Sequence, residues 1–149
     1  MKKELDKAST IGDIFSVVRR VVLDYFGQEQ AGLLVGLSDL GDSQESIVGA
    51  FYSPESNTLV INKRPLYLIE GDKHNAYLFN ILLKEYLHSL GYEDDTEVQM
   101  LVKDITKKYL RNVPTEFQGI ISGGILPEAE TLDIEYVGGI DRENTNYIL

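Results

Sequence analysis

Hydrophobic residues recur at helical spacing near the start of the chain, over residues 11–26. This spacing puts them in one stripe along one face, which predicts an amphipathic helix. Thr10 and Asp13 stand three residues apart and match a capping box, so we expect the helix to begin there. Gly27 is a residue that can leave a helix with a positive φ, so we expect the helix to end there. The role of this helix is predicted to be structural.

Two further helical stripes follow one another in the second half of the chain. One covers residues 75–90 and is followed by Gly91; the other begins in the acidic run 93–97 and continues to Tyr109. A glycine in this place is typical of a helix C-terminus. Acidic residues are favourable in the first turn of a helix because they meet the positive end of its dipole. We therefore expect two helices joined by a bend at Gly91.

Short apolar runs bounded by turn-forming residues predict strands. Four such runs occur, at residues 32–37, 47–52, 58–62 and 132–137. The turn-forming sequence 53–57 separates the second run from the third, so these two are expected to pair as an antiparallel hairpin. The fold class predicted is α+β, with a small mixed or antiparallel sheet packed on the helix 75–90 and on the acidic helix after it. Residues 1–149 are expected to form one domain, with residues 141–149 as an exposed tail.

The composition argues against several classes of protein. The 149 residues include 24 acidic and 14 basic ones, which gives a formal net charge of −10, and no cysteine. Without cysteine there is no disulfide framework, thiol nucleophile or thiolate metal site. The acidic balance argues against a nucleic-acid partner, because phosphate binding depends on clustered Lys and Arg. The charged N-terminus is unlike a signal peptide, and no apolar run approaches the ~20 residues that span a bilayer. We expect a soluble cytoplasmic protein without a membrane partner.

The residues most suited to catalysis or metal binding lie between positions 84 and 97. Lys84 and His88 stand four residues apart, so they project from one face of the predicted helix, and Glu85 lies about 100° around it. Beyond the bend, Asp94 and Glu97 can return toward the same face. One imidazole and several carboxylates are therefore expected to converge. The ordinary alternative is a solvated helix face with a histidine near its C-terminus.

The stretch 84–88, Lys-Glu-Tyr-Leu-His, resembles the His-Glu-x-x-His helix of zincin metallopeptidases, in particular the small gluzincin-like members (minigluzincins). The order of elements over residues 30–110 is also similar. The resemblance implies a compact sheet packed on the motif helix and an acidic ligand from the next helix. It matches His88 to the second zinc-binding histidine and Glu85 to the glutamate that activates the metal-bound water. It offers Glu97 as the first choice for the acidic ligand and Asp94 as the second.

The departure from the family pattern is Lys84, which stands where the first zinc-binding histidine belongs. Deprotonating a lysine at pH 7 costs about 4–5 kcal/mol before any bond to a metal forms. A charged lysine about 4 Å from a divalent ion is repelled by roughly 8 kcal/mol at an effective dielectric constant of about 20. We therefore expect an empty site and no cofactor, with zinc as the cofactor only if the site works. Lys84 is expected to pair instead with Glu85, Asp94 or Glu97.

Three functions remain open from the sequence. The first is a zincin-like homologue without peptidase activity that binds a peptide or protein, with strand addition along residues 58–62 as the predicted mode. The second is an active zinc metallopeptidase with a non-standard ligand, and His74 is the only other imidazole in the chain. The third is an α+β interaction module unrelated to zincins. The oligomeric state is left open.

Overall fold

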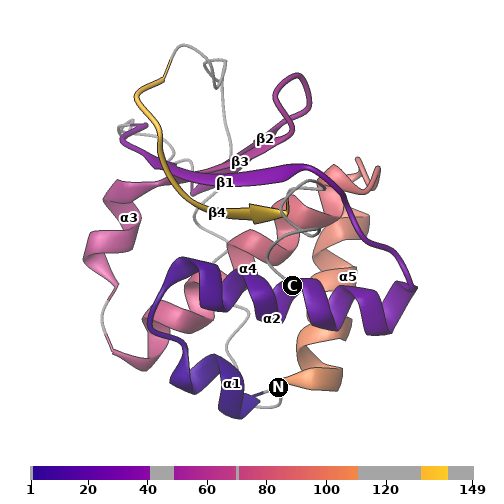
Figure 1. The fold of residues 1–149 in the computed structure, drawn as a ribbon. Helices are drawn as coiled ribbons and strands as arrows, with labels where there is room; N and C mark the ends of the chain where they lie inside the picture. The colour runs from indigo at the N-terminus through magenta and orange to yellow at the C-terminus, as the bar shows by residue number, and fades with distance from the viewer. Residues whose placement is uncertain (1, 41–48, 70, 111–131, 141–149) are drawn as a thin grey trace, which may run out of the picture.

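The computed structural model describes residues 2–40, 49–69, 71–110 and 132–140 (Figure 1). Helices and strands follow one another within these residues as α1 (Lys2–Lys7), α2 (Ile11–Phe26), β1 (Leu33–Ser38), β2 (Ala50–Ser53), β3 (Thr58–Asn62), α3 (Lys63–Leu68), α4 (Asp72–Ser89), α5 (Asp95–Tyr109) and β4 (Glu135–Ile140). The predicted α+β class is confirmed. The predicted tail at residues 141–149 lies outside the described residues, as do residues 47 and 48 of the second predicted strand.

The four strands form one mixed sheet in the order β2-β3-β1-β4. β1 and β3 run parallel, with Val35 beside Leu59, and β4 pairs antiparallel with β1. β2 and β3 form the predicted antiparallel hairpin. The prediction of strand addition along residues 58–62 is wrong, because β3 pairs with a strand on each side and has no free edge. Among the strands that the structure describes, β2 and β4 stand at the two edges of the sheet.

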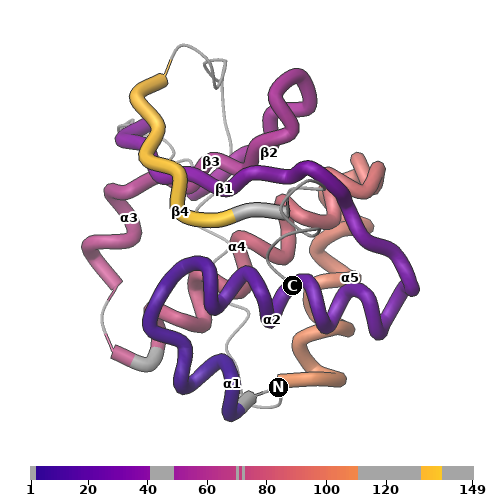
Figure 2. Tube along the Cα trace, viewed as in Figure 1, coloured from indigo at the N-terminus to yellow at the C-terminus, as the bar shows by residue number. Residues whose placement is uncertain are grey.

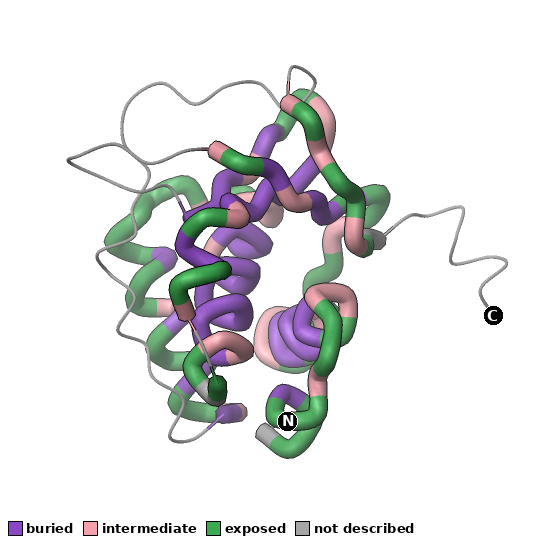
Figure 3. Tube along the Cα trace, turned by 90° about the vertical axis from the view of Figure 1, so that its left-hand side faces the viewer, coloured by how far each residue is buried: buried purple, intermediate pink, exposed green. Residues whose placement is uncertain are grey.

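Helices α2 and α4 cover one face of the sheet, and α5 packs beside α4 at the end of the molecule opposite α3 (Figures 1 and 2). Burial is concentrated where these helices meet the sheet (Figure 3). The core side chains of β1 and β3 that face the helices are Leu33, Val35, Leu59 and Ile61, all 0% exposed. The other face carries a smaller apolar cluster around Phe51 and Val60. α4 is therefore held between the sheet, α2 and α5.

The N-terminal capping box predicted for α2 is present. The Asp13 backbone N–H donates to Thr10 Oγ1 at 3.0 Å, and Asp13 Oδ2 accepts from the Thr10 N–H at 3.2 Å. Asp13 Oδ2 also accepts from the Ser9 backbone N–H at 3.1 Å, and this hydrogen bond, followed by the interaction with the Thr10 side chain, lowers the pKa of the Asp13 carboxyl. Gly27 ends the helix with φ 70°, as predicted. Local chemistry alone sets both ends of this helix.

Two short helices were not predicted from the sequence. α1 docks through Leu5, which is 1% exposed, and Asn75 Nδ2 donates to the Leu5 carbonyl at 2.9 Å. α3 follows β3 without a loop, because the Asn62 side chain accepts from the Arg64 N–H at 3.2 Å and caps the helix. Each helix has only six residues, too few for an apolar stripe to repeat.

The segment that leads into β4 lies close against β1. A Cβ atom on Gly36 would stand 2.2 Å from Ile134 Cγ2, so any larger residue at position 36 would displace this segment. Tyr136 pairs with Gly36 in the register of β1 and β4. The glycine therefore allows residues 132–136 to cross this face of the sheet.

Candidate functional site

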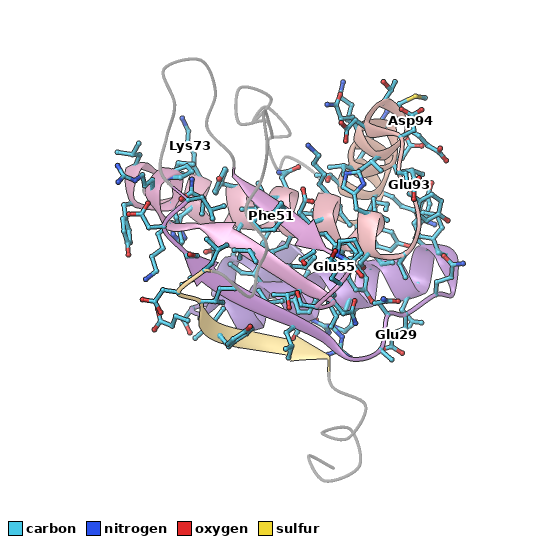
Figure 4. The ribbon with its side chains drawn as sticks, turned by 90° about the horizontal axis from the view of Figure 1, so that it is seen from above. Glu29, Phe51, Glu55, Lys73, Glu93 and Asp94 are labelled. Carbon is cyan, nitrogen blue, oxygen red and sulfur yellow. The ribbon has the colours of Figure 1, made fainter. Side chains whose placement is uncertain are left out.

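α4 carries the motif residues, and the turn after it directs the chain back toward them. The helix ends at Ser89, and Gly91 follows with φ 106°, a left-handed conformation that favours glycine. The Gly91 N–H donates to the His88 carbonyl at 3.0 Å. The predicted bend is thus present. It places the first turn of α5 beside the C-terminal end of α4, with Glu93 and Asp94 at the surface of this connection (Figure 4).

Glu85 is buried on the side of α4 that packs against β2, and it is only 7% exposed. Burial raises the pKa of the Glu85 carboxyl to about 8, because the charged form loses its hydration. The charge of Lys84 and a hydrogen bond from the Tyr52 backbone N–H oppose this rise, and the charge of Asp95 adds to it. Most of the Glu85 carboxyl is therefore protonated and neutral at pH 7.

His88 is held through both of its ring nitrogens. Nδ1 lies 2.8 Å from the Tyr92 carbonyl oxygen, and Nε2 lies 3.3 Å from Asp95 Oδ1. A carbonyl oxygen can only accept, so Nδ1 is the donor in the first contact. The second contact is also a hydrogen bond when the ring carries both protons. The His88 side chain, 18% exposed, is thus fixed between the α4–α5 connection and the first residue of α5.

The acidic residues expected near His88 take different places. Asp94 is exposed and caps α5, where its Oδ1 accepts from the Thr96 N–H at 3.2 Å. Glu97 is exposed in the first turn of α5. The carboxylate beside His88 Nε2 belongs to Asp95, a member of the acidic run 93–97 that was not among the predicted ligands. One feature of the sequence indicates this position: if Asp94 is the N-cap, Asp95 is the first residue of the helix.

Lys84 and His74 occupy separate places on α4. Lys84 is half-buried, and its positive charge acts on Glu85, one of the three partners expected for it. His74 lies in the first turn of α4, where its backbone N–H donates to the Gly71 carbonyl at 3.1 Å. Ten residues of helix separate the two side chains, which is about 15 Å along the axis. His74 therefore does not join the motif residues.

The arrangement around His88 does not fit a catalytic zinc ion. Such an ion needs three protein ligands and an open position. Within the part of the chain that the structure describes, no group of three or more His, Cys, Asp or Glu side chains is placed to hold a metal. His88 and Asp95 supply two donors that contact each other, Lys84 supplies a cation, and the Glu85 carboxyl is buried against β2. What these residues form is a structural contact between α4, α5 and the sheet.

A pocket of about 240 Å³ lies elsewhere, on the outer side of α2, and it is lined by Ser16, Arg19, Arg20, Leu23 and Glu29. Its two arginines are already paired with carboxylates. Arg19 Nη2 lies 3.1 Å from Glu29 Oε1, and Arg20 pairs with Glu4. The local charge is thereby neutralised, so this pocket offers no anion site.

Comparisons of this chain with protein-family models, with curated proteins and with solved structures find no match. Among the described residues, no helix has both the length and the apolar character needed to cross a membrane.

Proposed function

We propose that this chain is a zincin-like metallopeptidase homologue that lacks peptidase activity and binds a peptide or a protein instead. The observation that carries the proposal is the state of Glu85. A general base must be ionised at the working pH and must reach the water that it activates. Glu85 has a pKa of about 8 and lies in the protein interior.

The other motif positions support the same proposal. Lys84 brings a positive charge to the place of a metal ligand, and His88 Nε2 faces Asp95. A charged ammonium is unsuited to hold a divalent ion. Binding is the role that such a fold retains once its metal chemistry is gone. The partner class that we propose is a peptide or protein segment.

A cleavage assay tests the loss of peptidase activity. Wild type supplied with zinc is expected to leave an unfolded protein substrate such as β-casein intact, because the Glu85 carboxyl is mostly protonated at pH 7 and the described residues offer no three-ligand site. The Glu85→Gln variant, which cannot act as a base, is the matched control and is expected to behave like wild type. Cleavage that a chelator stops and that Glu85→Gln abolishes would instead identify an active metallopeptidase.

A further inference from the structure

Two tyrosine rings meet where α2 and α5 end. Tyr25 is in the last turn of α2, and Tyr109 is the last residue of α5. Their ring centroids are 6.5 Å apart, and the ring planes are inclined by 66°. The Tyr109 hydroxyl donates to Asp24 Oδ2 at 2.5 Å, which holds the second ring and brings a carboxylate next to the pair. Two aromatic rings and one anionic group are thus gathered at one place.

A positive charge of the chain itself lies at this place. Lys108 Nζ stands over both rings, 5.5 Å from the centroid of Tyr25 and 5.2 Å from that of Tyr109. Both distances are within the ~6 Å over which the face of an aromatic ring attracts a cation. Cations are also favoured near the C-terminus of a helix, and α2 has no basic residue in its own last turn. The rings, the carboxylate and the helix ends therefore all favour a positive charge here.

These groups suit an organic cation better than a metal ion. A calcium ion takes about six to eight oxygen ligands, whereas Asp24 supplies one carboxylate, which already accepts from Tyr109. Ring faces are the groups with which proteins bind quaternary ammonium ions, because the methyl groups that surround the charge pack on the rings. Lys108 is exposed and has a flexible side chain, so its ammonium can move out into solvent when another cation enters.

We propose that the faces of Tyr25 and Tyr109, together with Asp24, form a binding site for a trimethylammonium group. Lys108 is the internal occupant of this site, which the ligand displaces. Such a group is carried by a trimethylated lysine of a peptide or by a small molecule such as choline. The inference goes beyond the proposed function, because it uses none of the residues matched to the zincin motif.

NMR titrations with choline, and separately with a short peptide that carries one trimethyllysine, test the site. Lys108→Ala removes the internal competitor and should bind the better of the two ligands about fivefold more tightly than Lys107→Ala. Lys107→Ala is the matched control, because it removes the same charge from the neighbouring exposed position of α5. Tighter binding of the peptide would support a protein partner, and tighter binding of choline a small molecule. Equal affinities of the two variants would overturn the proposal.

Two further controls separate a cation site from an ordinary apolar surface. The uncharged isostere of choline, 3,3-dimethylbutanol, should bind Lys108→Ala at least about fivefold more weakly than choline does. Adding Tyr109→Leu to this variant removes one ring and should weaken choline binding about fivefold relative to adding Tyr109→Phe, which keeps the ring. Where Tyr109→Leu does not fold, the ring signals of Tyr25 and Tyr109 in Lys108→Ala give the readout, and they should shift on adding choline. Equal binding of the isostere, or ring signals that choline leaves unmoved, would overturn the proposal.

Discussion

Replacing Lys84 with histidine is expected to give the protein a zinc affinity at least about 100-fold tighter than that of Lys84→Gln. Both changes remove the ammonium that repels a divalent ion, but only histidine adds a neutral donor one helical turn before His88. A 100-fold gain corresponds to about 2.7 kcal/mol, a modest share of the ~10–16 kcal/mol that structural zinc sites reach. Isothermal titration with zinc at pH 7 measures the difference between the two variants.

The acidic ligand of the zinc site expected in Lys84→His can be identified by adding a second substitution to that variant. Asp95→Asn should lower the new zinc affinity, because Asp95 is the carboxylate beside His88 Nε2. Asp94→Asn is the matched control, since asparagine also caps a helix and Asp94 itself caps α5. If Lys84→His binds zinc no better than Lys84→Gln, the resemblance to zincins loses its support and an unrelated interaction module becomes the better account.

The free energy of unfolding of wild type should contain a contribution from Glu85 that falls as pH rises. Its folded pKa of about 8 lies above the ordinary value of 4.5, so the folded state binds more protons between these two pH values. The stabilisation is complete below the unfolded pKa and is lost as pH rises through the folded one. Between pH 4.5 and 7 the loss is about 3 kcal/mol. Glu85→Gln removes this contribution and should become the more stable protein by a growing margin.

Urea denaturation of the two proteins at pH 4.5 and pH 7 measures this margin. Other carboxyl groups titrate in both proteins, so their effects cancel in the difference. Glu97→Gln, a change of the same chemistry at an exposed position of α5, is the surface control. If the free energies of unfolding of wild type and Glu85→Gln change in parallel over this pH range, the Glu85 carboxyl is not confined to the interior.

The sequence predicted well those elements whose limits are set by residues close together in the chain. α2 begins and ends at the predicted residues because Thr10, Asp13 and Gly27 set its two caps within the chain itself. The β2–β3 hairpin follows from its turn. The order of strands does not, because the pairing of β1 with β3 and β4 joins residues far apart in the sequence. For this reason β3 was wrongly expected at the edge.

The same distinction applies to the candidate site. Helical spacing places Lys84, Glu85 and His88 on α4 as the sequence predicts. Which carboxylate meets His88 depends on the residue at which α5 begins, and acidic side chains stand at several adjacent positions there. The burial of Glu85 depends on how α4 packs against β2, a long-range contact without a local signal. Its raised pKa is therefore visible only in the folded chain.

The most direct test of the central claim is the zinc content of wild type, purified without a histidine tag, supplied with excess zinc and then desalted. Lys84 and the contact of His88 with Asp95 predict well below one zinc ion per chain. Near-stoichiometric zinc that is lost in a His88→Ala variant would contradict the account.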